Sequence, residues 1–100
     1  MEIFESTITS DTGSVSKRAD KASTTSVMVT FSAPFLATPK VTLSLENCVN
    51  YKGGSMRGYI TISATDITKT SFVIKIKNSH QSNGYYADCT IKWSAICELT

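Results

Sequence analysis

The sequence predicts an all-β fold, a six-stranded antiparallel β-sandwich, from three observations. Several segments alternate apolar and polar residues with a period of two, which is the pattern of strands with one buried face. Residues that favour turns separate these segments, and no stretch shows the 3.6-residue period of an amphipathic helix. The chain has 100 residues, of which 41% are hydrophobic, and this fits one domain with one core. We therefore expect residues 1–100 to form a single domain.

The first part of the chain predicts a short strand and a long loop. Residues 4–8 have the alternation of an opening strand, with Phe4 and Ile8 on one side. Residues 10–26 are rich in Ser, Thr, Asp and Lys and show neither the strand nor the helix period. We therefore expect a long surface loop there, and long loops within a compact domain often carry functional residues.

Two half-buried strands follow, joined by a connection with a proline at each end. Apolar side chains recur at every second position within residues 27–31 and again within residues 41–45. Because proline has no backbone N–H for a strand ladder, Pro34 and Pro39 are expected between the strands and not inside them. A shift of one residue would expose the whole apolar set, so the pattern also fixes the register.

The remaining elements alternate polar connections with three strands. The predicted strands are Tyr59–Ala64, Phe72–Lys77 and Tyr85–Cys97, and the predicted connections are residues 46–56, 65–70 and 78–84, the last as a polar hairpin loop. The final strand has the longest alternation, so we expect it at the centre of a sheet, with Trp93 on its apolar face and in the core.

Charge and composition exclude several classes of function. The formal net charge is +2, and ten basic residues are scattered among eight acidic ones, so no nucleic-acid partner is expected. The apolar runs are far shorter than the ~20 residues of a membrane span, which excludes membrane insertion by a helix. Residues 1–5 lack the pattern of a secretion signal. An extracellular location is favoured, with the chain in its mature form or exported by another route.

The three cysteines and the single histidine do not predict a metal site or a cofactor. Cys89 and Cys97 lie eight residues apart on one predicted strand, about 26 Å at ~3.3 Å per residue, which is too far for a disulfide. Cys48 can pair with either of them, but three buried free thiols are the favoured interpretation. His80 has no neighbouring Cys or second His to share a metal ion.

A spaced series of residues runs from the first half of the chain to its end: Phe31, Pro34, Phe35, Pro39, Val41, Leu43, Ser44, Thr70, Ser71, Phe72, His80, Trp93, Ala95 and Ile96. This series resembles the H-type lectin domain of snail agglutinins and discoidins. The resemblance covers about residues 5–96. It implies a six-stranded antiparallel sandwich that assembles as trimers, sometimes paired into hexamers, and binds galactose or N-acetylgalactosamine between protomers. It also implies an agglutinin that engages glycans at several sites without a cofactor.

The resemblance implies three sugar-contacting residues. Asp20, eleven residues before Phe31, and His80, eight residues after Phe72, match the family's acidic and histidine ligands by spacing. Arg57 is the counterpart of the family's arginine. A carboxylate, a guanidinium and an imidazole together can complement an axial 4-hydroxyl beside a 3-hydroxyl, because they offer both hydrogen-bond donors and acceptors.

Four further residues complete the predicted site. Ser79 stands where the family commonly has tryptophan, which removes an apolar wall, and Tyr85 or Tyr86 is expected to supply it from across the loop. Arg18 is a candidate through the Lys17–Arg18 pair, for which a solvated loop is the favoured interpretation. The family's disulfide has no counterpart, because Ser10 and Ile76 stand at its positions. We therefore expect packing alone to hold the fold.

The predicted function is non-covalent binding of sugars, without catalysis. A glycosidase needs two carboxylates about 5–10 Å apart across one bond, and of the acids only Asp20 has a place in the predicted site. No local signature supports a cysteine nucleophile with His80. The alternative is a structural trimerisation or fibre-tip adhesion domain without a specific sugar site.

Overall fold

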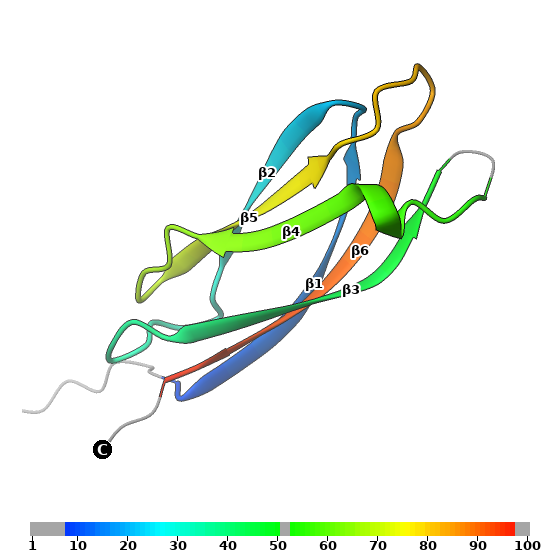
Figure 1. Cartoon of the computed structure of the whole chain (residues 1–100). Helices are drawn as coiled ribbons and strands as arrows, with labels where there is room; N and C mark the ends of the chain where they lie inside the picture. The colour runs from blue at the N-terminus through cyan, green and yellow to red at the C-terminus, as the bar shows by residue number, and fades with distance from the viewer. Residues whose placement is uncertain (1–7, 51–52, 98–100) are drawn as a thin grey trace, which may run out of the picture.

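The computed structural model describes residues 8–50 and 53–97 and confirms the all-β prediction. Six strands form two three-stranded antiparallel sheets that pack as a β-sandwich (Figure 1). One sheet has the order β1 (Ser10–Ala19), β6 (Ala87–Ile96), β3 (Lys40–Val49), and the other has the order β2 (Ser23–Thr30), β5 (Ser71–Asn78), β4 (Ile60–Thr65). A single turn of 3-10 helix, η1 (Arg57–Tyr59), precedes β4. No helix in the described ranges is long and apolar enough to cross a membrane.

The core lies between the two central strands, and β6 is central as predicted. Alternate side chains of these strands are buried: Phe72, Ile74 and Ile76 on β5, and Ala87, Cys89, Ile91, Trp93 and Ala95 on β6. Burying each of the larger ones stabilises the fold by roughly 1.5–3 kcal/mol. Four aromatic rings, those of Phe31, Phe35, Phe72 and Trp93, close one end of this core, with neighbouring centroids 4.8–5.8 Å apart.

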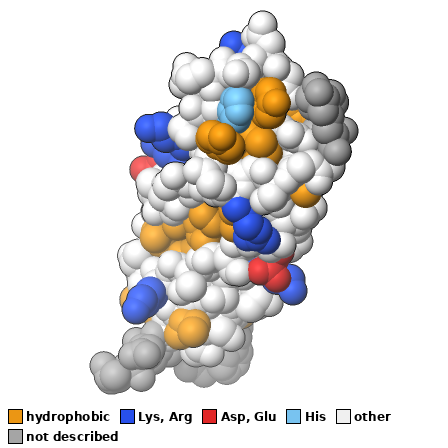
Figure 2. All heavy atoms as spheres, turned by 45° about the vertical axis from the view of Figure 1, so that its right-hand side comes forward, with side chains coloured by type: hydrophobic (Ala, Val, Ile, Leu, Met, Phe, Trp, Pro, Cys, Tyr) orange, Lys and Arg blue, Asp and Glu red, His pale blue; other side chains and the backbone are white. Residues whose placement is uncertain are grey.

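At one lateral edge of the sandwich, apolar side chains are only partly buried. β3 and β4 are both edge strands, and they lie beside each other on the same side of the sandwich. Their inward side chains are packed against the core but only partly buried: Val41, Leu43, Leu45, Ile60, Ile62 and Ala64. Figure 2 shows hydrophobic side chains at the surface across the middle of the molecule. We call these six residues the β3/β4 edge strip.

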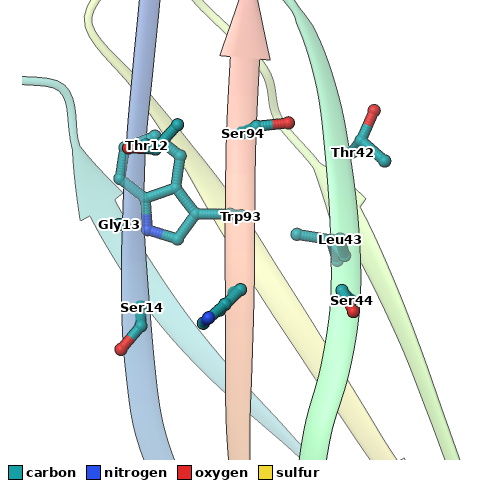
Figure 3. Close-up of a pocket in the computed structure, with 9 residues that line it drawn as sticks. Thr12, Gly13, Ser14, Thr42, Leu43, Ser44, Trp93 and Ser94 are labelled. Atoms are coloured by element: carbon teal, nitrogen blue, oxygen red, sulfur yellow. The ribbon is translucent and has the colours of Figure 1, made fainter.

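The predicted long loop at residues 10–26 is wrong, because these residues form β1 and the first half of β2. The inward positions of β1 include Asp11 and Gly13 and therefore lack the apolar alternation on which the prediction depended. The indole of Trp93 reaches across from β6 and fills the space at Gly13 (Figure 3), where an added Cβ would lie 2.7 Å from Trp93 Cζ2. The neighbouring strand thus supplies the apolar group that β1 itself lacks.

The predicted loop at residues 46–56 is also partly wrong, because β3 continues to Val49. A β-bulge between Leu45 and Asn47 shifts the register against β6 by one residue. The inward series of Val41, Leu43 and Leu45 therefore resumes at Cys48 and not at Asn47. A bulge inserts one extra residue and breaks the period of two, so the alternation in the sequence stops before the strand does.

Most connections cross from one sheet to the other. Residues 79–86 join β5 to β6, which lie in different sheets, so the predicted hairpin loop is instead a crossing connection. Pro34 and Pro39 lie in the connection between β2 and β3, as predicted. Of the predicted opening strand, residues 4–7 lie outside the described residues, and Ile8 forms one isolated bridge to Phe35.

Candidate functional site

His80 lies in the crossing connection after β5, between two tyrosine rings. The Tyr85 ring is stacked on the imidazole with centroids 4.0 Å apart and an interplanar angle of 2°, and the Tyr59 ring is tilted against it at 4.4 Å. Figure 2 shows the histidine among hydrophobic side chains at the surface. The backbone N–H of Ser82 donates to Nδ1 at 3.1 Å. The neutral ring therefore carries its proton on Nε2, which is a donor for a ligand oxygen.

A buried amide, Asn78, builds the frame around this histidine. Its Nδ2 donates to the carbonyls of Ala19 at 3.2 Å and Tyr85 at 2.9 Å, and its Oδ1 accepts from the backbone N–H of His80 at 3.0 Å. The side chain is 1% exposed, and a buried polar group needs such partners to avoid the cost of desolvation. Asn78 thus joins the end of β1 to both sides of the connection.

Asp20 lies in the turn between β1 and β2, and this turn is bonded to the backbone at His80. The N–H of Ala22 donates to the carbonyl of His80 at 2.8 Å, and Ser23 Oγ donates to the carbonyl of Asp20 at 2.7 Å. Ala22 has φ of 50°, in the left-handed region. The side chain of Asp20 is exposed. Two segments that are 60 positions apart in the sequence are therefore neighbours in the fold.

Ser79 brings the end of η1 to the same place. Both its backbone N–H and its Oγ donate to the carbonyl of Tyr59, at 2.9 and 3.2 Å. Tyr59 is 45% exposed, so part of its side chain is accessible to a ligand. The sequence predicts Tyr59 only as the first residue of a strand, and its place beside His80 was not predicted. One feature of the sequence could have pointed to Tyr59: it is an aromatic residue at an outward position of the alternating segment 59–64, where polar residues are expected.

Arg57 makes contacts that the resemblance does not imply. Its guanidinium donates to the carbonyls of Leu45 and Glu46, each at 2.7 Å. These carbonyls belong to the β-bulge of β3, where the ladder to β6 is interrupted. Arg57 therefore ties the bulge to η1 through two of its five N–H groups, two residues before Tyr59.

Arg18 and Tyr86 form a separate cluster with Asp88 on the outer face of β1 and β6. Arg18 Nε and Nη2 donate to the two carboxylate oxygens of Asp88 at 2.8 and 3.3 Å, and the Tyr86 ring covers the guanidinium at 3.8 Å. The hydrogen bond to Asp88 raises the pKa of Arg18. The guanidinium of Arg18 is thus already paired with groups of the protein, and the ring stacked on His80 is that of Tyr85.

Two surface hollows add to the description. One of about 320 Å³ adjoins the His80 frame and is lined by Ala22, Ser23, Thr24, Lys77, Asn78, Ser79 and Gln81. A larger one of about 570 Å³ lies on the β1–β6–β3 sheet (Figure 3), where small hydroxyl side chains surround Gly13, Leu43, Lys92 and Trp93. Over residues 8–50 and 53–97, no group of three His, Cys, Asp or Glu residues could hold a metal ion.

Known proteins are similar to this chain in fold. The N-truncated R1-type pyocin tail fibre matches with a TM-score of 0.66 and 14% identity, over 89% of this chain and 70% of that one. The R1 pyocin fibre of P. aeruginosa gives 0.63 and 15%, and the tailspike of Pseudomonas phage phi297 gives 0.61 and 20%. The chain covers 23% and 15% of these two longer proteins. At such identities the likeness shows the fold alone.

No curated protein matches the chain by sequence. The model of the H-type lectin domain, in contrast, matches residues 26–96. This range runs from β2 to the end of β6 and includes Tyr59, Asn78, His80 and Tyr85. The chain therefore belongs to the H-type lectin domain family.

Proposed function

We propose that this domain binds terminal galactose or N-acetylgalactosamine residues of glycans at the end of the sandwich around His80. The observation that carries the proposal is the imidazole held between Tyr59 and Tyr85, beside the backbone of the turn that bears Asp20. A galactose ring has an apolar C–H face and an axial 4-hydroxyl. The exposed Tyr59 ring can pack against the C–H face, and the Asp20 carboxylate and the His80 Nε2–H can accept from and donate to the 4-hydroxyl.

Arg57 and Ser79 are part of this proposal in different ways. Arg57 retains N–H groups beyond the two that bind β3, and these can donate to a sugar hydroxyl. Ser79 positions Tyr59 through its backbone N–H and hydroxyl. Tyr85 orients the imidazole. Arg18 and Tyr86 are proposed to support the turn that bears Asp20 and not to contact the sugar, because Asp88 and the Tyr86 ring already bind the Arg18 guanidinium.

We also infer that the domain acts as a homo-oligomer, a trimer or a hexamer, outside the cell and without catalysis. The β3/β4 edge strip exposes apolar side chains in a row, and a second copy is a suitable cover for them. A small polar ligand buries little area and binds weakly. Several sites on one oligomer raise avidity by roughly 10²–10⁴-fold on a glycan-coated surface, which gives an agglutinin.

Calorimetric titration with galactose and with glucose, its 4-epimer, tests the sugar site. Galactose is expected to bind roughly 5- to 150-fold more tightly, since a misplaced hydroxyl leaves a polar partner unpaired at a cost of ~1–3 kcal/mol. Asp20→Asn is expected to reduce galactose affinity by about 10-fold or more. Asp66→Asn is the matched control, because Asp66 is also an exposed turn acid but lies at the other end of β5. Unchanged galactose affinity in Asp20→Asn would refute the role of Asp20.

Sedimentation analysis gives the oligomeric state and a glycan array gives the sugar binding, and the two together separate the proposed function from a purely structural one. An oligomer that binds no galactose, N-acetylgalactosamine or other glycan on an array would support the structural trimerisation alternative, which uses the same β3/β4 edge strip. Glycan binding by a monomer would instead support the proposed sugar site and refute the proposed oligomer. Binding that disappears on treatment with a chelator would show that a metal ion takes part.

A further inference from the structure

Two buried thiols face each other across β3 and β6. Cys48 and Cys89 are direct partners in the antiparallel ladder, and their Sγ atoms are 3.6 Å apart. The side chains are 2% and 1% exposed. Paired residues of an antiparallel ladder have Cα atoms about 4.5–5.5 Å apart, and this range lies within the ~4.4–6.8 Å spanned by disulfides. The strands therefore already hold the two cysteines at a spacing that a disulfide can bridge.

We propose that Cys48 and Cys89 form a cross-strand disulfide when the protein folds in the presence of a disulfide oxidant, and that Cys97 remains a thiol. The reaction proceeds by thiol–disulfide exchange with oxidised glutathione or an equivalent. One cysteine thiolate attacks the oxidant and releases one glutathione thiol, and the second attacks the mixed disulfide and releases another. Two S–H bonds are lost, one S–S bond forms, and the oxidant takes up the two electrons and the two protons.

The environment of the pair determines when it can react. Burial raises the pKa of Cys48, and burial together with the neighbouring Cys48 and Asp88 raises the pKa of Cys89 to about 12. Because the thiolate is the attacking species, the folded reduced protein is expected to react slowly at neutral pH. Oxidation during refolding is expected to be much faster, since the unfolded chain exposes both thiols.

The disulfide would fix the strand end that supports Tyr59. The N–H of Met56 donates to the carbonyl of Cys48 at 2.9 Å, and Met56 is buried. Arg57 binds the bulge carbonyls just before Cys48, and Tyr59 follows within the same turn of η1. The two cysteines are 41 positions apart, and closing a loop of this size is expected to raise the Tm by about 10 °C or more.

Mass spectrometry of the full chain tests the pair, with Cys97 as the internal control. After refolding with oxidised glutathione, the wild type is expected to be about 2 Da lighter than the reduced protein and to accept one alkyl group in denaturant. Cys97→Ser is expected to accept none. Three alkylated thiols, or a peptide map that places Cys97 in the disulfide, would overturn the proposal. This result does not depend on sugar binding.

The pH dependence of stability gives a second readout that needs no substitution. An unfolded cysteine with a pKa near 9.0 loses its proton before the folded Cys89, whose pKa is about 12. The unfolded state therefore binds fewer protons between these values, and the stability of the reduced protein falls as pH rises through this range. The oxidised protein has no thiol at Cys89 and is expected to show a smaller fall. Equal falls in both forms would contradict burial of the thiol pair.

Discussion

Two clusters of aromatic rings lie at opposite ends of β5, and they differ in what their rings expose. At the Ser71 end, Phe31, Phe35, Phe72 and Trp93 pack together and are buried. At the Asn78 end, Tyr59, His80 and Tyr85 stack as closely but stay partly exposed. Phenylalanine gains only from burial, whereas tyrosine and histidine carry polar atoms that need water or a ligand. The first cluster therefore stabilises the fold, and the second is suited to bind.

The largest expected effect is the loss of a ring from the buried cluster. Phe72 is 0% exposed and contacts both Phe31 and Trp93. Phe72→Ala is expected to lower the free energy of unfolding by about 3–5 kcal/mol, because it removes buried apolar area and leaves a cavity. Guanidinium denaturation measures this change. Tyr59→Ala is the counterpart in the other cluster and is expected to cost below about 1.5 kcal/mol while weakening galactose binding. Equal losses of stability in Phe72→Ala and Tyr59→Ala would show that the two aromatic clusters do not differ in their contribution to the fold.

Asn78 sharpens the comparison, because among residues 8–50 and 53–97 it is the one polar residue that is buried, and it lies at the Asn78 end of β5 beside His80. Asn78→Ala leaves the carbonyls of Ala19 and Tyr85 and the N–H of His80 without this partner. The expected loss of stability is about 1–3 kcal/mol. Hydrogen exchange should show the effect first at the His80 amide. A His80 amide that stays protected would mean that Asn78 does not hold the connection.

Gly13 tests how tightly the buried cluster is packed against β1. An added Cβ would lie 2.7 Å from Trp93 Cζ2, and a rigid indole surrounded by other rings has little room to move. Gly13→Ala is therefore expected to cost about 1–3 kcal/mol and to change the tryptophan fluorescence. Ser14→Ala, on the exposed face of the same strand, should stay within ~0.5 kcal/mol. A neutral Gly13→Ala would indicate a looser cluster than the contacts imply.

Ala22 offers the smallest effect and the opposite sign. Its φ of 50° lies in the left-handed region, which costs an L-residue roughly 1–2 kcal/mol. Ala22→Gly relieves this strain but adds freedom to the unfolded chain, so a net gain of about 0.5 kcal/mol is expected by thermal unfolding. The gain should leave galactose binding unchanged, because the N–H that binds His80 is retained. A loss of stability would show that the turn is not strained.

The strands that could be predicted are those whose own side chains fill the core. β4, β5 and β6 alternate apolar and polar residues almost throughout, and the prediction of each is confirmed to within two residues. β1 was missed because Trp93 of another strand fills the space at Gly13. The end of β3 was missed because a bulge breaks its period. The pairing of strands across the two sheets is a non-local property that periodicity does not encode.

The site was predicted through the family resemblance more than through residue patterns. The roles of Asp20, Arg57 and His80 remain predictions, although the turn of Asp20 and the connection of His80 are neighbours. Asn78 and Tyr59 were missed, because their contacts depend on how the chain folds: Asn78 reaches Ala19, 59 residues away, and Tyr59 bonds to Ser79, 20 residues away. Asn78 does leave a signal, as an amide at an inward position directly after Phe72, Ile74 and Ile76. The contacts of Arg57 depend on bulge carbonyls that no local pattern reveals.

The crossing connections have a consequence for assembly of the chain. Among the six strands of the described residues, only β4 and β5 are consecutive strands of one sheet, and every other step from strand to strand changes sheets. Neither three-stranded half can therefore form ahead of the other from a continuous piece of sequence. Such topologies pay loop-closure entropy before their contacts form and reach the native state in milliseconds to seconds. The molecule should accordingly unfold in one cooperative step, in which both sheets lose their structure at the same time.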